Sequence, residues 1–296
     1  MKPLAATASA FLLLAGAASA APGDDLYTRP GRLVAASGTR LNLYCTGNGS
    51  PAVVFDSGWE DWAPVWAIVQ PQVAKWTRAC SYDRAGAGFS DAGPMPRTSM
   101  RIADELHAAL RHAGIKGPYV LVGHAFGGDN VRTFAARYAA ETAGLVLVEA
   151  DVGGPPRSCA QQFFRGLPET MWSPELNAKL LELAQTKVAM YDAFISEMEQ
   201  MSADEEYLQQ HSPSLGSRPV RVLSTGNHGV HSLAPGRTMT AEQQQYQNHV
   251  ASSQAKWLEL SSNARQLFTD KSSEYLPFDQ PEFVIDAIRE VYSQSR

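Results

Sequence analysis

One glycine-flanked segment combines residue types and spacing that suit covalent chemistry. Residues 123–127 read Gly-His-Ala-Phe-Gly; they follow a short apolar run and precede a helical pattern that we expect to open at Asp129. In the nucleophile elbow G-x-S-x-G, two glycines permit a strained turn that lifts a nucleophilic side chain above a sheet, at the positive end of the next helix. The central residue here is Ala125, and a methyl group cannot attack a carbonyl. The segment therefore predicts an elbow without its nucleophile.

A second glycine-rich motif, residues 83–91, reads D-R-A-G-A-G-F-S-D. It lacks the Lys-Ser/Thr pair of a P-loop and the G-x-G-x-x-G spacing of a dinucleotide site, so we expect no nucleotide there. Metal binding has no support either, because the cysteines lack C-x-x-C spacing and no two histidines stand four apart around a glutamate. We expect neither a metal nor any other cofactor.

The first twenty residues have the form of a secretory signal peptide. Lys2 precedes an apolar run, and residues 18–20 form an A-x-A cleavage site. That run is too short for a membrane span, and no other stretch is long and apolar enough for one. The chain carries a net charge of −5, which suggests neither a nucleic-acid nor an anionic-membrane partner. We therefore expect a secreted or periplasmic protein after removal of residues 1–20.

Strand-like and helix-like segments alternate along the rest of the chain. Apolar or alternating stretches predict strands at residues 41–45, 52–55, 78–82, 120–122, 144–149, 218–225 and 265–269. Amphipathic spacing predicts helices at residues 65–76, 102–113, 256–260 and 284–291, with Gly114 closing the second of them. This alternation is typical of a mostly parallel sheet covered on both faces, whose ligands bind beyond the carboxyl ends of the strands.

Residues 153–217 depart from this alternation, with helices and loops that carry many aromatic residues and methionines. Such a segment suits a helical cap over the strand ends, where its apolar side chains either pack together or face a ligand. We expect one core domain made of residues 21–152 and 218–296, with residues 153–217 as the cap.

Three separated motifs make the chain resemble the α/β-hydrolase superfamily, from about Thr39 onward. Residues 123–128 are similar to G-H-S-F-G-G, residues 83–91 to D-R-A-G-x-G-x-S-D, and residues 272–282 to S-G-H-x-x-x-x-D-x-P-E. The order of these motifs resembles that of the serine esterase and lipase branch. The resemblance implies the α/β-hydrolase fold: a mostly parallel central sheet, helices on both faces and a helical cap inserted after strand six.

The resemblance also implies roles for residues at the elbow. Ala125 occupies the place of the nucleophilic serine and Glu274 that of the catalytic histidine, so two members of the triad are replaced. The backbone N–H groups of Phe126 and Trp59 take the places of the two oxyanion-hole donors.

Three further residues near these positions are candidates for substrate contact: Gly58, Trp62 and His124. The tryptophans after strand three suggest an apolar or aromatic substrate, although they also suit a protein core. His124 lies within the elbow, and we expect its side chain to point away from the nucleophile side.

The acid of the triad follows strand six or strand seven in this superfamily. Residues 224–228 end strand seven without a carboxylate, whereas strand six ends in Glu149-Ala150-Asp151. Glu149 is the first choice, by resemblance to the haloalkane dehalogenases, and Asp151 is the second. A strand-end carboxylate in water or in a salt bridge is the alternative interpretation.

The chain has three cysteines, at positions 45, 80 and 159. In an oxidising compartment, one disulfide and one leftover thiol is the simplest arrangement. The sheet order of the superfamily makes strands two and four neighbours, which implies that Cys45 is bonded to Cys80 and that Cys159 is free.

The resemblance implies a serine hydrolase of carboxylic esters, lactones or amides, whose partner is a small apolar or aromatic ester-like molecule. With the serine and histidine replaced, the oxyanion hole and substrate binding alone leave roughly 10³–10⁴-fold catalysis over water, so the chain should be a poor esterase. Three other interpretations remain: a catalytically inactive protein that binds a small ligand, an enzyme of another reaction with Glu274 as general base, and a structural or partner-binding role for the cap.

Overall fold

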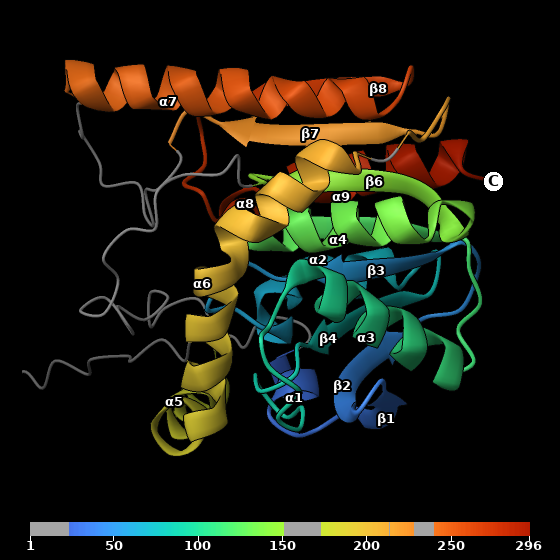
Figure 1. Ribbon diagram of the computed structural model, residues 1–296, viewed down its shortest axis with the longest axis vertical. Helices are drawn as coiled ribbons and strands as arrows, with labels where there is room; N and C mark the ends of the chain where they lie inside the picture. The colour runs from blue at the N-terminus through green and yellow to red at the C-terminus, as the bar shows by residue number, and fades with distance from the viewer. Residues whose placement is uncertain (1–23, 151–172, 213, 228–239) are drawn as a thin grey trace, which may run out of the picture.

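A central eight-stranded sheet organises the computed structural model, which describes residues 24–150, 173–212, 214–227 and 240–296 (Figure 1). The strands are β1 (Arg32–Ala36), β2 (Thr39–Thr46), β3 (Ala52–Asp56), β4 (Ala79–Asp83), β5 (Tyr119–His124), β6 (Thr142–Val148), β7 (Val220–Thr225) and β8 (Ala264–Thr269). Their spatial order is β1-β2-β4-β3-β5-β6-β7-β8. The pairs β1–β2 and β2–β4 are antiparallel and the other pairs are parallel, so the predicted fold class is confirmed.

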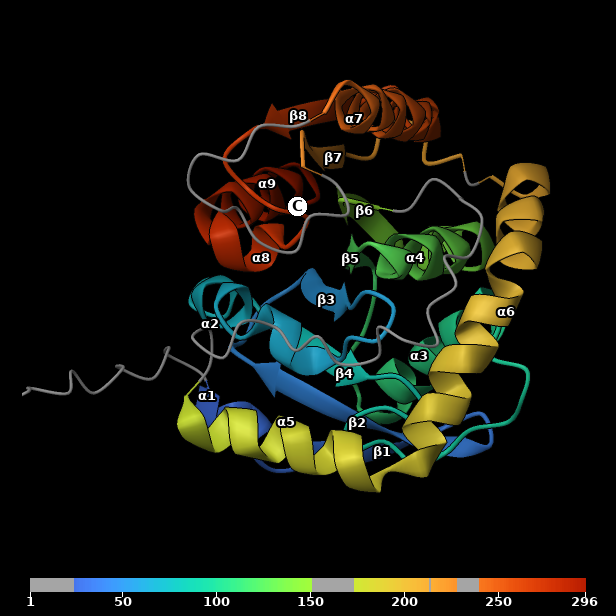
Figure 2. The same cartoon turned by 90° about the vertical axis from the view of Figure 1, so that its left-hand side faces the viewer.

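Helices cover both faces of this sheet (Figure 2). They are α1 (Asp24–Tyr27), α2 (Val69–Val73), α3 (Ser99–His112), α4 (Phe126–Arg137), α5 (Pro174–Thr186), α6 (Val188–Gln210), α7 (Ala241–Gln254), α8 (Leu276–Asp279) and α9 (Pro281–Gln294). Three short 3-10 helices, η1 (Ala63–Trp66), η2 (Ala139–Glu141) and η3 (Ala255–Leu260), complete the described elements. α3 and α4 pack on one face of the sheet, and α2 and α9 pack on the other.

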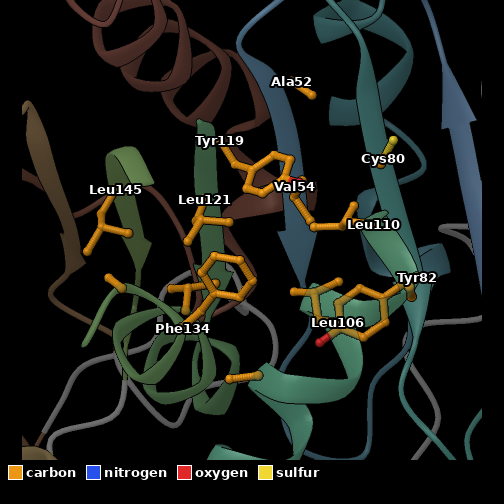
Figure 3. Packing of buried hydrophobic residues seen from close by; sticks show 14 of the residues in the cluster. Ala52, Val54, Cys80, Tyr82, Leu106, Leu110, Tyr119, Leu121, Phe134 and Leu145 are labelled. Carbon is orange, nitrogen blue, oxygen red and sulfur yellow. The ribbon is translucent and has the colours of Figure 1, made fainter. Parts of the chain in front are cut away.

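The parallel strands at the centre of the sheet are buried on both faces. All residues of β3, β5, β6 and β7 are buried, which explains why the first three segments are mainly apolar rather than alternating; β7 also buries Arg221. On the α3–α4 face, Leu121 of β5 meets Phe134 of α4, and Leu106 and Leu110 of α3 complete the layer (Figure 3). The sheet is thus a rigid platform whose strand ends can hold a site.

One predicted helix is wrong in extent. Residues 65–76 were expected to form a single helix, but the structure has η1 and then the separate α2. Pro71 explains the break, because it lies in the first turn of α2, where no N–H is needed, but has no N–H to donate to the Ala67 carbonyl in a helix that began at residue 65. The prediction for residues 102–113 is confirmed by α3, and Gly114 follows it with a φ of +75°, as a left-handed cap requires.

The helices α5 and α6 form an insertion between β6 and β7, as the fold prediction required (Figure 1). They contact the loops that follow β3 and β4, and so lie at the carboxyl ends of the strands. Within the described residues, no helix has both the length and the apolar character needed to cross a membrane. The predicted signal peptide, Asp151, Cys159 and the aromatic residues between positions 151 and 172 lie outside the described residues.

The predicted disulfide is confirmed. Cys45 of β2 and Cys80 of β4 are cross-strand partners with Cα atoms 4.1 Å apart, and their sulfur atoms are bonded. The bond ties the antiparallel strand β2, which lies between β1 and β4, to the parallel part of the sheet across 35 residues of sequence.

Removing this disulfide should lower the free energy of unfolding by about 3–4 kcal/mol, because the bond restricts the unfolded chain across a loop of that length. The double substitution Cys45→Ala with Cys80→Ala avoids a new free thiol, and urea unfolding measures the loss. Cys159→Ala, which keeps the bond, is the control. Three alkylated thiols in the intact mass of the native protein would contradict the pairing.

Candidate active site

The turn after β5 has the backbone strain of a nucleophile elbow. β5 ends at His124, Ala125 has a φ of 46° and a ψ of −121°, and α4 begins at Phe126. A non-glycine residue at positive φ costs of the order of 1–3 kcal/mol and persists only where the surrounding structure requires it. Here the Ala125 N–H donates to the Val148 carbonyl at 3.0 Å, and the Gly128 N–H donates to the Ala125 carbonyl at 2.8 Å. The elbow is therefore retained around a methyl side chain.

The helix after the elbow starts earlier than its apolar pattern indicates. It was expected to open at Asp129, but α4 begins at Phe126. Gly127 and Gly128 have no side chains to contribute to a hydrophobic pattern, whereas the hydrogen bonds of the helix begin directly at the turn. Because α4 begins at Phe126, the N–H of this residue, the first predicted oxyanion donor, lies at the positively polarised end of the helix.

The elbow also depends on close backbone approach at Gly127. A Cβ placed there would lie 2.5 Å from the Asp56 carbonyl oxygen and 2.7 Å from that of Ser57, and both are backbone atoms with no room to yield. Gly127→Ala should therefore lower the free energy of unfolding by about 3 kcal/mol. The control is Gly114→Ala, where a Cβ meets nothing within 4 Å and only the positive φ costs about 1 kcal/mol. Equal losses in thermal or urea unfolding would contradict this prediction.

The loop after β3 meets the elbow at Gly58. A Cβ placed on Gly58 would lie 3.4 Å from the Ala125 Cβ, 3.3 Å from His124 Nδ1 and 3.2 Å from Asp61 Oδ2. The missing side chain thus lets the loop approach the elbow closely. Trp59, which carries the second predicted oxyanion N–H, is the next residue in the chain.

The tryptophans of this loop face the cap. The Trp59 indole N–H donates to the Phe194 carbonyl of α6 at 2.8 Å. Trp59 and Trp62 both pack against the buried cluster that includes Met190 and Phe194. The loop and α6 therefore share an apolar layer close to the elbow.

Glu274 lies in the segment after β8, and its backbone is held to the elbow by His124. His124 Nε2 is 3.0 Å from the Glu274 carbonyl oxygen; because a carbonyl only accepts, Nε2 carries the hydrogen. The His124 ring is buried, with its centre 6.4 Å from the Trp66 ring and 5.6 Å from the Tyr275 ring. His124 thus joins the segment that contains Glu274 to the turn that contains Ala125.

Glu149 lies at the carboxyl ends of β6 and β7. It is fully buried, has a φ of 47°, and its carboxylate accepts the backbone N–H of Thr225. The Thr225 hydroxyl donates to the Ser272 carbonyl at 2.7 Å, two residues before Glu274. Glu149 therefore reaches the segment that contains Glu274 through one intervening residue, Thr225.

Acidic side chains gather around Tyr275. Burial raises the pKa of the Tyr275 phenol well above its usual range, and the charges of Asp61, Glu274 and Glu60 raise it further. Sequence reasoning missed Glu60, Asp61 and Tyr275, although each stands within two residues of Trp59 or Glu274. The described residues contain no group of three His, Cys, Asp or Glu side chains placed to hold a metal ion.

A buried carboxylate anchors the glycine loop that follows β4. Asp83 accepts from Asn42 Nδ2 at 2.8 Å and from the N–H groups of Phe89 at 2.9 Å and Ala63 at 3.2 Å. Burial raises the pKa of Asp83 to about 6, although these hydrogen bonds and Lys187 oppose the rise. Asp83 therefore orders the loop but resists ionisation.

This raised pKa predicts a pH effect on stability. Between about pH 4 and pH 6 the folded protein holds a proton on Asp83 that the unfolded chain releases, so the contribution of Asp83 to the unfolding free energy falls as the pH rises. Asp83→Asn does not titrate. The unfolding free energy of the unchanged chain minus that of Asp83→Asn should therefore be smaller at pH 7 than at pH 4, as measured by urea unfolding. A difference that grows with pH would contradict the prediction.

An eight-stranded, mostly parallel sheet with a strained turn after β5 and a helical insertion after β6 defines a protein of the α/β-hydrolase class. The chain belongs to the α/β-hydrolase fold family, whose profile matches residues 51–200. An uncharacterized protein of Bacillus subtilis, YqjL, is 26% identical over 250 residues, which cover 83% of this chain and 85% of that protein.

Two solved structures share the fold. A thermophilic esterase from Thermogutta terrifontis matches with a TM-score of 0.61 and 18% identity, covering 89% of this chain and 98% of the esterase. The epoxide hydrolase CorEH matches with a TM-score of 0.69 and 16% identity, covering 90% of this chain and 99% of that protein.

Proposed function

We propose that this protein is an ester-hydrolase scaffold whose nucleophile and base positions are occupied by Ala125 and Glu274. In this form it binds a small, apolar or aromatic ester-like molecule and turns it over poorly. The observation that carries the proposal is the strained backbone of Ala125, because an alanine in an ordinary turn has no reason to adopt a φ of 46°.

The surrounding backbone supports the same proposal. The Phe126 N–H lies at the start of α4, and the loop carrying Trp59 reaches the elbow at Gly58. Acting together, these two N–H groups would bind the oxygen of a carbonyl, and would stabilise the oxyanion that forms when a nucleophile attacks it. Nucleophilic attack and proton transfer are the missing steps. Ala125 has no nucleophilic side chain, and Glu274 replaces a histidine base only in part.

A second candidate function assigns Glu274 as a general base toward a water molecule or a carbon acid. The observation that favours it is the contact of His124 Nε2 with the Glu274 carbonyl at 3.0 Å, which brings residue 274 close to the elbow. Glu274→Gln removes the base without changing its size, so loss of an activity shown by the unchanged chain would support this function.

We also propose that the protein is exported to an oxidising compartment. The Cys45–Cys80 disulfide supports this proposal, because such bonds persist outside the reducing cytosol. Fractionation of cells that express the full chain, with the mass of the N-terminus, tests both export and cleavage after residue 20.

Turnover of short p-nitrophenyl esters tests the main proposal. The unchanged chain should show a low rate, and the protein carrying Ala125→Ser with Glu274→His should show a high one. Equal and high rates would assign catalysis to another group, whereas two inactive proteins would overturn the ester-hydrolase scaffold.

A further inference from the structure

One buried arginine joins the cap to the loop that carries the second oxyanion donor. Arg84 follows β4 and is 2% exposed. Its Nη1 donates to the Ser57 carbonyl at 2.7 Å, and its Nη2 donates to the Gly58 carbonyl at 2.8 Å. These two carbonyls share their peptide planes with the Gly58 and Trp59 N–H groups, so Arg84 sets the orientation of the peptide planes beside the elbow.

The remaining donors of Arg84 bind two buried carboxylates. Nη1 also contacts Asp56 Oδ1 at 3.1 Å, at the end of β3. Nε and Nη2 contact the two carboxylate oxygens of Glu197 at 2.8 Å and 3.1 Å, and Glu197 belongs to α6 of the cap. All five N–H bonds of the guanidinium are therefore used, and none is left for a ligand.

Two further contacts hold α6 against the same loops. The Trp59 indole donates to the Phe194 carbonyl, one turn before Glu197. Lys187, directly before α6, donates to the carbonyls of Gly88 at 2.6 Å and Ser90 at 2.5 Å, in the loop that begins with Asp83 and Arg84. The start of α6 is thus fixed to the core by polar contacts at both loops.

We propose that the loop of residues 57–59 keeps its orientation only while α6 is docked, because Arg84 and Glu197 connect the two. In this way the cap regulates the site as well as covering it. The proposal rests on the proposed function for its catalytic consequence. Without Glu197, two donors of a buried guanidinium lose their partners, and Arg84 must shift toward other acceptors. The carbonyls of residues 57 and 58 then lose their fixed orientation, and the Trp59 N–H with them.

The first test is hydrogen exchange in the unchanged chain and in Glu197→Gln, which keeps the size of the side chain but removes its charge. Backbone amides of residues 57–61 should exchange about tenfold faster in the variant, while amides of β5 and β6 stay protected. The matched control is Glu205→Gln on the same helix, whose carboxylate lies 3.5 Å from Arg132 of α4 and contacts neither loop. Unchanged exchange at residues 57–61 in folded Glu197→Gln would overturn the proposal.

The second test measures kcat and KM in the protein that carries Ala125→Ser with Glu274→His. Adding Glu197→Gln should lower kcat about tenfold or more with little change in KM, because an oxyanion donor acts chiefly in the transition state. Adding Glu205→Gln should change neither. If the protein carrying Ala125→Ser with Glu274→His is inactive without further change, that result counts against the proposed function. The hydrogen exchange experiment then still decides the role of Glu197.

Two other variants keep the proposal testable if Glu197→Gln does not fold. Glu197→Asp keeps the charge but withdraws the carboxylate by one methylene, and Arg84→Lys keeps the positive charge but cannot reach four acceptors. Either should give the same local increase in exchange at residues 57–61. Protection equal to that of the unchanged chain in both would overturn the coupling.

Discussion

Substituting Ala125→Ser together with Glu274→His should raise kcat/KM for short p-nitrophenyl esters by about 10³ or more. The backbone of the elbow is already strained as a nucleophile requires, and the N-terminus of α4 already lies behind it. The serine would supply the attacking oxygen, and the histidine would take its proton and return it to the leaving group. The assay is release of p-nitrophenolate at pH 8.

Each substitution alone should recover little of this activity. In a triad that works as a unit, removing the serine or the histidine alone costs about as much as removing all three members, of the order of 10⁶ in kcat. Ala125→Ser therefore lacks its base, and Glu274→His lacks its nucleophile. A single variant as active as the double one would show that the two positions do not act together.

Adding Glu149→Gln to the doubly substituted protein should lower kcat by about 10³–10⁴. The carboxylate of Glu149 is buried at the ends of β6 and β7, and accepts the Thr225 N–H. From there it would orient the new imidazole and stabilise its charged form, whereas an amide holds the ring in the wrong tautomer. KM should change little, because the acid does not contact the substrate.

The control for this prediction is Asp151→Asn in the same protein, since Asp151 is the other candidate acid. It should leave kcat within about twofold. A large loss from Asp151→Asn with none from Glu149→Gln would reverse the assignment. Thermal unfolding of both variants separates catalysis from folding, because Glu149 is fully buried.

Local pattern was sufficient to predict much of this fold. Continuous apolar runs correctly indicated the buried parallel strands, since a strand covered on both faces has no polar side to reveal. The disulfide followed once the resemblance supplied the strand order, because Cys45 and Cys80 stand at matching places on adjacent strands. Helix starts were less predictable, as α4 shows, because Gly127 and Gly128 carry no side-chain pattern.

By itself the sequence predicted most of the strands and an elbow-like segment centred on Ala125, and the resemblance placed Glu274 at the expected histidine position. Only the tertiary structure decided that Arg84 binds Glu197, 113 residues away, and that Glu149 binds Thr225, 76 residues away. The physical reason is that periodicity reports whether a side chain is buried, but not which distant group lies opposite it. Those partners depend on the sheet order and on how the cap docks, and both are set by packing of the whole chain.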